Sequence, residues 1–292
     1  MYERVLPLMY NKEPYEKLSP NIYTSTDSGI LVVENLREFG YHGVSIGSLF
    51  DLHGCKIVWK SLAQFHALST KSLETFSANI DSLTVMDRCP NEWEPSIFRP
   101  QAEKWKEHVL PLLSDTLINN ETLDDFITNV CPAINLGFSP NENGSNVIVH
   151  GDLHLRNLLL HRDENKCKFI DFQLSRRGSP LIDLIYFTII GVQFEVFDKP
   201  RDELFDLYVH EFNSVLEQSS RSNKTFYTVD NLQADFEKLK SHFFFILIAI
   251  GPITWANDFK TSGSTNDEDN LNLLFKSEKY VPALKGWIKL LL

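Results

Sequence analysis

One short segment constrains the fold of this chain more than any other, because it spaces two carboxylates and an amide around a predicted β-hairpin. It reads His-Gly-Asp-Leu-His-Leu-Arg-Asn, so that Asn157 follows Asp152 by five residues. Residues 158–161 and 166–171 are two strand-like stretches on either side of a turn-forming Arg-Asp-Glu-Asn, which predicts an antiparallel hairpin. In such a hairpin the start of the first strand lies beside the end of the second. The sequence therefore predicts that Asn157 and Asp171 converge on one site.

These residue types suit phosphoryl transfer. Mg²⁺ in proteins takes a few oxygen ligands and shares the rest with substrate phosphates, so we predict that Asn157 and Asp171 bind this metal. Asp152, on the loop before the hairpin, would face the metal site and accept the proton of an attacking hydroxyl. His150 is grouped with Asp152 in the catalytic loop, where we expect it to brace the backbone rather than take part in the chemistry.

Two other interpretations of this segment compete with a phosphoryl-transfer site. Taken singly, an Asp or Asn in a hairpin is more often a turn or capping residue than a ligand. The joint occurrence of the spacing, the hairpin and the apolar residue before Asp171 favours the site.

The second alternative is zinc held by His150, His154 and His161. The spacing of the first two suits a helix, but the intervening Gly-Asp and the following hairpin disfavour one, and no Cys-x-x-Cys or His-Glu-x-x-His motif supports zinc.

Most of the remaining chain has helical periodicity. Over residues 52–69, apolar side chains recur on one helical face, and His66 lies on that face as a hydrogen-bonded core histidine. Aromatic residues in the helical regions are more often core residues, but they are also candidates for an apolar acceptor pocket, namely Trp93, Phe98, Trp105 and Trp255. Further helices are predicted at residues 101–113, 123–130, 181–194, 201–218 and 230–250.

Composition excludes several classes of protein. The net charge of −11 disfavours a dedicated nucleic-acid surface. The apolar stretches at 181–194 and 243–255 fall short of the ~20 residues that span a bilayer, so we expect no membrane partner. The four cysteines are widely spaced and unpatterned, as in a reduced protein. We therefore expect a cytoplasmic protein.

The chain resembles the ecdysteroid kinase-like (CHK kinase-like) family of the aminoglycoside phosphotransferase and choline kinase superfamily. The resemblance is strongest over residues 147–187, where the loop and Ile-Asp-Phe-Gln are followed by Leu-Ser-Arg-Arg-Gly-Ser-Pro-Leu-Ile-Asp-Leu-Ile-Tyr-Phe. His154 stands where this family usually has Trp, and it is common in the aminoglycoside phosphotransferase branch. Upstream, residues 62–68 resemble the family's Leu-Ala-x-Phe-His-Ala stretch, and residues 29–36 resemble its last N-lobe strand and hinge.

This resemblance implies an α+β, protein-kinase-like fold with a mainly helical C lobe and a catalytic β-hairpin. It also implies ATP as phosphoryl donor and Mg²⁺ as cofactor, with main-chain groups of the hinge bonded to adenine. Asp183 is expected to support the catalytic loop by hydrogen bonding, since a buried carboxylate without partners costs several kcal/mol. The residues expected to contact the nucleotide are Glu34, Asn35, Leu36, Leu159 and Ile170.

The resemblance further implies two parts of unequal size. Residues 1–36 correspond to a remnant of the kinase-like N lobe with its hinge, and residues 37–292 to the C lobe with a helical substrate-binding extension. A complete N lobe carries a phosphate loop, a strand Lys and a helix Glu. We expect this N lobe to be truncated. The phosphate loop and the strand Lys then have no counterpart, and Glu3 is the only candidate to replace the helix Glu. Slow turnover and an exposed apolar strand at residues 30–33 are then expected.

Three functions follow from these expectations. The first is an ATP-dependent O-phosphotransferase acting on a small-molecule hydroxyl, on an ecdysteroid-like or another alcohol. The second is a pseudokinase or a kinase-derived module that binds a small molecule or a protein. The third is a truncated product or gene model of the enzyme in the first. Choline- or aminoglycoside-type kinase activity is the alternative within the enzyme class, and no residue pattern specifies the acceptor or an oligomeric state.

Overall fold

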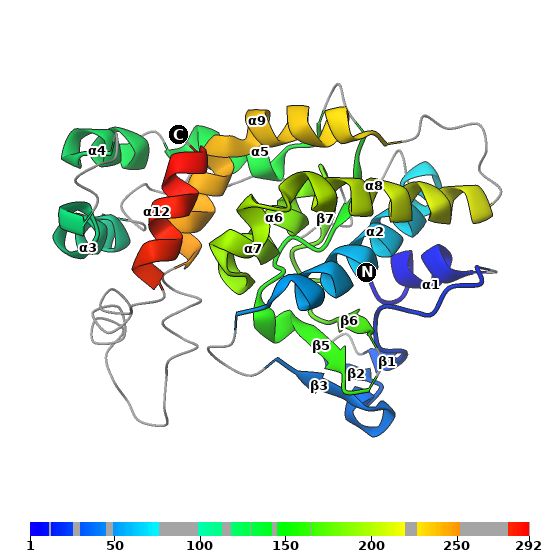
Figure 1. Cartoon of the computed structure of the whole chain (residues 1–292). Helices are drawn as coiled ribbons and strands as arrows, with labels where there is room; N and C mark the ends of the chain where they lie inside the picture. Colours follow the sequence, from blue (N-terminus) through cyan, green and yellow to red (C-terminus); the bar gives the residue numbers. More distant parts are fainter. Residues whose placement is uncertain are drawn as a thin grey trace.

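The computed structural model describes residues 1–291 apart from several short stretches and two long ones. In it, small antiparallel sheets accompany a mainly helical body, and two of them lie at its lower edge in Figure 1 while the third lies among the helices. The positions that are not described are 12, 26–29, 45–48, 76–98, 113–117, 129, 142–144, 164, 220–226, 252–279 and 292.

The described strands form three separate sheets, all antiparallel. The central one has the order β3-β5-β6 and contains the predicted hairpin, in which Leu158 lies opposite Phe169. The other two are the ribbons β1-β2 and β4-β7. The strands are β1 (Ile22–Ser25), β2 (Leu31–Val33), β3 (Tyr41–Gly43), β4 (Val147–Val149), β5 (Leu158–His161), β6 (Cys167–Phe169) and β7 (Arg176–Gly178).

Helices make up the rest of the regular structure. Short turns of 3₁₀ helix precede β3 and β5, and a π-helical turn continues α9. The helical elements are α1 (Val5–Tyr10), η1 (Leu36–Phe39), α2 (Leu52–Thr75), α3 (Arg99–His108), η4 (Leu110–Leu112), α4 (Asn120–Thr128), α5 (Val130–Phe138), η5 (Leu155–Asn157), α6 (Leu181–Gly191), α7 (Phe194–Asp198), α8 (Arg201–Gln218), α9 (Val229–Phe245), η6 (Ile246–Ile250) and α12 (Tyr280–Leu291).

The long helix α2 lies at the centre and packs against α8, α1 and β4. The side chains of Val58, Trp59 and Leu62 are fully buried along its apolar face, and burying each contributes about 1.5–3 kcal/mol. Asp51 begins the helix by accepting a hydrogen bond from the Gly54 N–H at 2.8 Å. The predicted helical segment at 52–69 is confirmed, and the helix continues one to two turns further.

The helix α6 is buried along its whole length, which is why its sequence is apolar on every side. The predicted segment 181–194 ends early because Val192 is extended and forms an isolated β-bridge with Phe50. The segment predicted at 201–218 is confirmed with those bounds. No described helix is long and apolar enough to cross a membrane.

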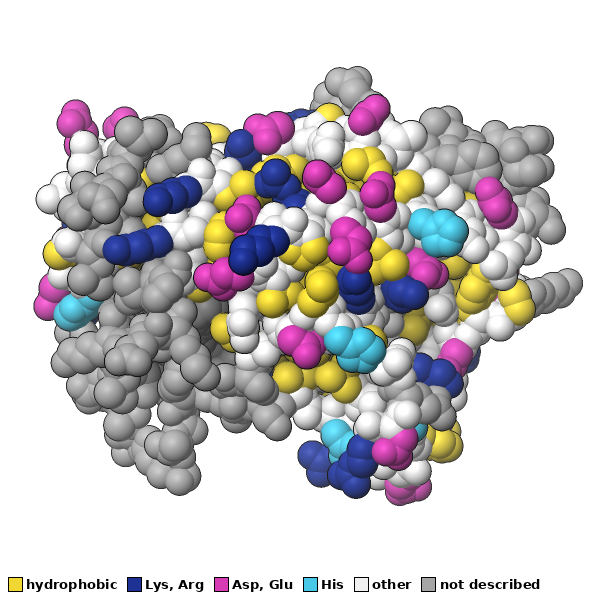
Figure 2. Space-filling view, in the orientation of Figure 1, with side chains coloured by type: hydrophobic (Ala, Val, Ile, Leu, Met, Phe, Trp, Pro, Cys, Tyr) yellow, Lys and Arg dark blue, Asp and Glu magenta, His cyan; other side chains and the backbone are white. Residues whose placement is uncertain are grey.

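Exposed apolar side chains are concentrated on one ribbon. Of the exposed large hydrophobic residues among the described positions, all but Phe39 of η1 lie on β1-β2 or directly before β2. The predicted exposure of the apolar strand is found, with Leu31 and Val32 each 44% exposed although they point to opposite faces. Elsewhere, on the face shown in Figure 2, acidic and basic side chains are interspersed. The exposed residues are Tyr23, Ile30, Leu31, Val32 and Phe39.

The contact between α5 and α9 leaves no room for a side chain at Gly137, where an added Cβ would lie 2.0 Å from the His242 ring. We predict that Gly137→Ala lowers the free energy of unfolding by about 1–3 kcal/mol, the usual cost of overpacking. The clash with His242 is expected to outweigh the higher helix propensity of Ala, which by itself would favour the substitution by about 1 kcal/mol. Urea unfolding of both proteins measures the difference. Gly43→Ala is the matched control, since nothing lies within 4 Å of its Cβ position. Equal stability of the two variants would show that the His242 ring moves away from the added methyl group without an energetic cost.

Candidate active site

The loop between β4 and η5 begins with a glycine that the backbone requires. Gly151 has a φ of +84°, and a Cβ there would lie 2.2 Å from the carbonyl oxygen of Leu174 and 2.4 Å from Arg176 Nη1. Only glycine fits both the left-handed conformation and this close approach. The loop therefore turns sharply as it leaves β4, and Asp152 follows at the turn.

The carboxylate of Asp183, in α6, binds the backbone N–H groups of this turn. Its Oδ2 accepts hydrogen bonds from the His150 N–H at 2.6 Å and from His66 Nε2 at 3.0 Å, and its Oδ1 accepts one from the Gly151 N–H at 2.8 Å. Asp183 and His66 are both fully buried. Burial by itself raises the pKa of Asp183, but the hydrogen bond and charge of His66, with the other donors, bring that pKa below its ordinary value. Asp183 is thus ionised and fully hydrogen-bonded.

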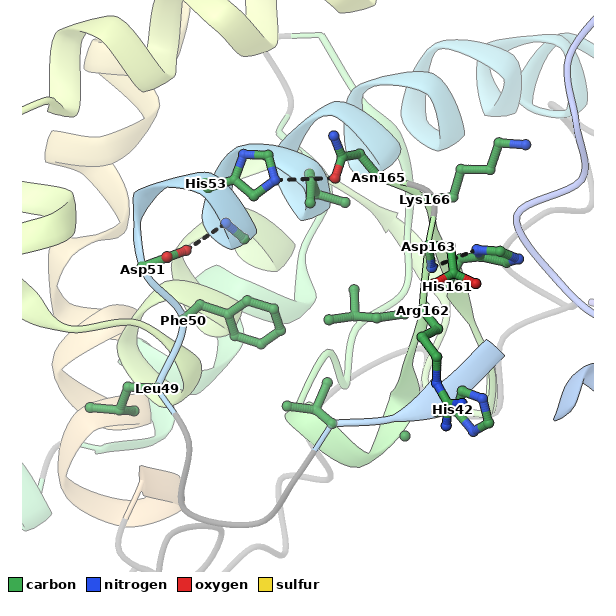
Figure 3. A pocket seen from close by; sticks show the side chains of 15 residues that line it. His42, Leu49, Phe50, Asp51, His53, His161, Arg162, Asp163, Asn165 and Lys166 are labelled. Carbon is green, nitrogen blue, oxygen red and sulfur yellow. Dashed lines mark hydrogen bonds between the residues drawn. The ribbon is translucent and has the colours of Figure 1, made fainter. Parts of the chain in front are cut away.

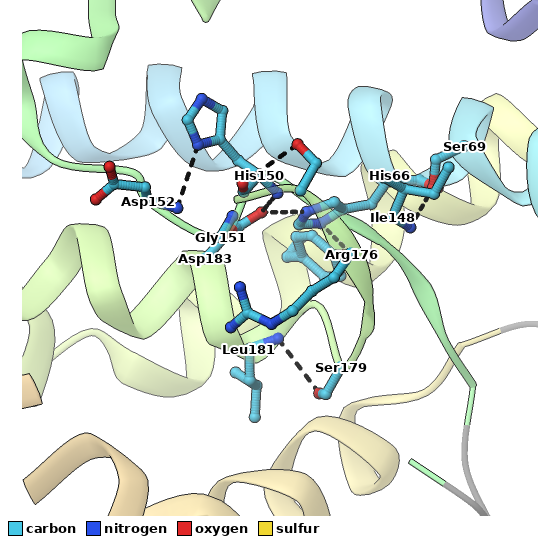
Figure 4. Close-up of polar contacts among 12 residues, drawn as sticks. His66, Ser69, Ile148, His150, Gly151, Asp152, Arg176, Ser179, Leu181 and Asp183 are labelled. Atoms are coloured by element: carbon cyan, nitrogen blue, oxygen red, sulfur yellow. Dashed lines mark hydrogen bonds and ion pairs between the residues drawn. The ribbon is translucent and has the colours of Figure 1, made fainter. Parts of the chain in front are cut away.

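His66 extends this network into α2 and α8. Its Nδ1 lies 3.0 Å from the Tyr208 hydroxyl, and its carbonyl oxygen accepts from Ser69 Oγ at 2.7 Å. Ser69 Oγ in turn accepts from the Ile148 N–H of β4 at 2.9 Å, as Figure 4 shows. The prediction of a hydrogen-bonded core histidine at position 66 is confirmed.

The ring of His150 joins the loop to the hairpin. Its Nε2 lies 2.8 Å from the carbonyl oxygen of Ile170, and its Nδ1 accepts from the Asp152 N–H at 3.3 Å. One neutral tautomer, protonated at Nε2, satisfies both contacts. Burial lowers the pKa of His150, which favours this neutral form. Both ring nitrogens are occupied by backbone groups, which leaves no nitrogen for acid or base chemistry.

Asp152 is held through its backbone and its side chain. Asn157 Nδ2 donates to the Asp152 carbonyl oxygen at 2.8 Å, and the Tyr186 hydroxyl donates to Oδ1 at 3.1 Å. The other carboxylate oxygen, Oδ2, lies 3.7 Å from His154 Nε2. The side chain is 17% exposed, so the carboxylate is mostly enclosed and still reachable.

Asn157 and Asp171 lie at the same end of the hairpin. The register pairs Leu158 with Phe169, and the Ile170 N–H donates to the Asn157 carbonyl oxygen at 3.1 Å. Asp171 has a φ of +63° and is the one non-glycine residue in the described chain with a positive φ. Such a conformation costs energy and is concentrated at functional sites. The two predicted metal ligands are therefore brought to neighbouring backbone positions.

These residues fit a shared magnesium site by the chemistry of their donors. The Nδ2 of Asn157 is used for hydrogen bonds, which leaves its Oδ1 for a cation. The carboxylate of Asp171 is exposed and makes no hydrogen bond or ion pair with the described residues. No group of three or more His, Cys, Asp or Glu side chains in the described part could hold a metal ion by itself. The set therefore suits Mg²⁺ that is completed by phosphate oxygens.

The predicted hinge residues are ordered by their own contacts. The Glu34 N–H donates to the Asn21 carbonyl oxygen at 2.8 Å, so that this group is not open to a base. The Asn35 side chain caps η1 by accepting from the Arg37 N–H at 3.3 Å, and Leu36 is buried. Adenine contacts at this segment would fall to the remaining main-chain groups. The role of the hinge stays a prediction.

The hairpin residues predicted to contact nucleotide are half-buried. Leu159 lies on β5 opposite Gly43, and the carbonyl oxygen of Ile170 is bonded to His150. A separate cleft of about 630 Å³ opens between the start of α2 and the sheet, lined among others by Phe50, Leu160 and His53 (Figure 3). Because Leu159 and Leu160 point to opposite faces of the sheet, this cleft lies on the other side from Leu159.

Other predicted candidates are placed apart from this site or lie outside the described residues. His161 ends β5, three residues beyond Leu158, which separates it by about 10 Å from the start of the strand where Asn157 lies. The alternative of a zinc site shared by His150, His154 and His161 is therefore wrong. Trp105 is fully buried, while Trp93, Phe98 and Trp255 lie outside the described residues.

Two residues of the site were missed from the sequence. Tyr186, which contacts the Asp152 carboxylate, lies three residues after Asp183 in the same helix, and this spacing places both on one face. Arg176 is buried, and burial lowers its pKa to about 10 while it donates to the carbonyl oxygens of Gly137 and Leu174. The helical spacing could have indicated Tyr186. No local pattern indicates the contacts of Arg176.

A loop Asp, an Asn and a hairpin Asp in this arrangement are typical of kinase-like phosphotransferases. The model of the ecdysteroid kinase-like family matches residues 1–220. The chain belongs to this family, and the resemblance inferred from the motif is confirmed. The predicted α+β, kinase-like fold with a mainly helical lobe and a hairpin is confirmed as well.

No curated protein matches significantly, and the solved structures that match are distant in sequence. One is an ethanolamine kinase from Plasmodium vivax, 14% identical, which covers 96% of this chain and 73% of its own, with a TM-score of 0.43. Another is a putative aminoglycoside phosphotransferase from Ralstonia eutropha, 16% identical, covering 94% and 78%, with a TM-score of 0.41. A third is a choline/ethanolamine kinase family protein from Mesorhizobium loti, 13% identical, covering 93% and 78%, with a TM-score of 0.39.

We predict that Asp183 stabilises the fold in a pH-dependent way. Its pKa in the folded protein is lowered from the ordinary value of 3.8. The stabilisation is therefore fully present above that value and is lost as the pH falls through the lower folded-state pKa. Asp183→Asn should cost about 3–5 kcal/mol at neutral pH, since it leaves buried donors without a carboxylate. It should also remove part of the acid dependence of stability. Urea unfolding across the acidic range measures both effects.

Asp163→Asn is the control, because Asp163 is an exposed residue at the turn of the hairpin. It should leave both stability and its pH dependence unchanged. A parallel pH profile for Asp183→Asn and wild type would mean that Asp183 is not ionised in the folded protein.

Proposed function

We propose that this protein is an ATP-dependent O-phosphotransferase that transfers a phosphoryl group to the hydroxyl of a small molecule. One observation carries the proposal. Asp152, Asn157 and Asp171 are fixed on a single loop and hairpin by contacts that leave one oxygen of each side chain without a hydrogen bond from the described residues. Phosphoryl transfer depends on positioning and charge stabilisation, and this arrangement provides both.

Each residue has a distinct role in this proposal. Asn157, through Oδ1, and Asp171 would hold Mg²⁺, which neutralises charge on the transferred phosphoryl group when it is bound. Asp152 accepts the proton of the acceptor hydroxyl on its carboxylate. His150 and Asp183 fix the loop and do not touch the reacting atoms. The unpartnered carboxylate and strained backbone of Asp171 support a ligand-binding role, because strain of this kind persists where the surroundings maintain it.

The nucleotide and acceptor sides of the site are proposed more broadly. We assign adenine to the segment Glu34–Leu36 together with Leu159 and Ile170, with residues 1–36 as the hinge-bearing part and 37–292 as the helical lobe. The acceptor is a small alcohol, and membership of the ecdysteroid kinase-like family favours a bulky apolar one. We place the protein in the cytoplasm.

We predict that Asp171→Ala abolishes the effect of Mg²⁺-ATP on thermal stability. A ligand at a hundred times its Kd stabilises a folded protein by about 2.7 kcal/mol, so a wild-type protein under these conditions should unfold at a higher temperature. Without the carboxylate of Asp171 the metal loses a ligand, and the shift should disappear while the unliganded protein stays folded. Thermal unfolding with ATP alone, Mg²⁺ alone and both together measures this.

Asp163→Ala is the matched control for this experiment. It removes an exposed carboxylate from the opposite end of the same hairpin and should keep the full shift. A shift that survives in Asp171→Ala would remove Asp171 from the nucleotide site.

We also predict that Asp152→Asn abolishes acceptor-dependent release of ADP. Removing a general base costs about 10²–10⁴-fold in rate, while the metal ligands and the thermal response to Mg²⁺-ATP remain. The measurement is ADP release with a panel of hydroxylated acceptors that includes a sterol-like alcohol, choline and an aminoglycoside. Turnover that Asp152→Asn leaves intact would contradict the assigned role. A wild-type thermal response without turnover on any acceptor would instead favour a nucleotide-binding module.

A further inference from the structure

The helix α6 contacts the catalytic loop at two points, and the proposed chemistry uses only one of them. Asp183 holds the backbone of the loop at His150 and Gly151. One helical turn later, the Tyr186 hydroxyl donates to Asp152 Oδ1 at 3.1 Å. Residues three apart lie on the same face of a helix, so both anchors belong to one rigid element. The helix thus fixes the loop and the carboxylate that the loop carries.

The Tyr186 hydroxyl is suited to be a permanent donor. Tyr186 is 7% exposed, and burial, followed by the charge of Asp152, raises its pKa well above the ordinary value. The hydroxyl therefore stays protonated wherever Asp152 is ionised. A hydrogen bond from a neutral hydroxyl to a carboxylate is charge-assisted and holds the carboxylate in one orientation.

The two oxygens of Asp152 are consequently unequal. Oδ1 accepts from Tyr186, whereas Oδ2 lies 3.7 Å from His154 Nε2, beyond hydrogen-bonding distance. The charged and titratable groups that face this carboxylate come from the loop, from α6 and from β7. They are His150, His154, Tyr186 and Arg176.

We propose that Tyr186 is a positioning residue that selects Asp152 Oδ2 as the proton acceptor, an inference that rests on the proposed phosphotransferase function. The acceptor oxygen forms a bond to the γ-phosphorus of ATP, and its proton passes to Oδ2. The bond from that phosphorus to the bridging oxygen breaks, and its electron pair leaves with ADP. Tyr186 keeps its own proton throughout and does not touch the substrate.

Tyr186→Phe tests this, because it removes the hydroxyl and keeps the buried ring. We expect kcat to fall about tenfold, as the loss of one charge-assisted hydrogen bond allows, with the KM for ATP unchanged. A purely structural role would lower stability without this separate loss of kcat at an unchanged KM.

Tyr227→Phe is the matched control. Tyr227 is also buried, and its hydroxyl also donates to a carboxylate oxygen, that of Asp235 at 3.0 Å, which lies outside the loop. It should lose a similar amount of stability and keep the wild-type kcat and KM. Equal kinetic effects of the two variants would overturn the proposal.

A second measurement does not require turnover. Carbon-13 NMR of labelled aspartate side chains at one neutral pH, with the Asp152 signal assigned by its absence in Asp152→Asn, observes that carboxylate directly. Its chemical shift should change in Tyr186→Phe, which removes the hydrogen bond to Oδ1, and stay unchanged in Tyr227→Phe. An unchanged chemical shift in Tyr186→Phe overturns the inference whether or not the protein is active. A changed chemical shift in a protein that phosphorylates no acceptor supports the positioning contact and contradicts the proposed function.

Discussion

The buried carboxylate of Asp183 is the interaction on which the rest of the structure depends. It is a charge in a fully buried helix, and such a charge is tolerated only when its hydrogen bonds are complete. The three donors come from α2, through His66, and from the loop after β4. One ionised group therefore connects the central helix, the buried helix α6 and the turn at Gly151. The apolar packing of α2 and α6 contributes to the stability, and this group sets how the two helices are joined to the loop.

The hairpin and the loop could be predicted from the sequence because their signals are local. A turn-forming tetrad between two short strands fixes the register, and the register alone brings Asn157 to Asp171. The helical period placed α2 and α8 for the same reason. Asp183 could be expected to need partners, but His66 lies 117 positions away, and no periodicity encodes a contact over that separation. The role of Tyr186 depends on that same unpredicted docking of α6.

Short elements were the hardest to predict. The strand β3 has three residues, Tyr-His-Gly, which is too short for a two-residue alternation to be recognised. It becomes a strand because β5 presents a free edge beside it, which is a tertiary effect. The conformation of Asp171 is a similar case, since a left-handed aspartate has no sequence signature beyond its residue type. Both features lie at the hairpin, where the geometry depends on contacts between residues far apart in the sequence and not on local sequence patterns.

The burial of α6 also determines how the loop can move. The amide protons of His150 and Gly151 point at a carboxylate inside a helix that is buried from Leu181 to Gly191. Amides in such positions exchange with solvent only when the surrounding cooperative unit opens. The backbone immediately before Asp152 should then be among the slowest-exchanging parts of the chain, although the Asp152 side chain itself reaches solvent. A loop at a functional site is usually drawn from the least stable part of a protein, and here it is bound to the most stable.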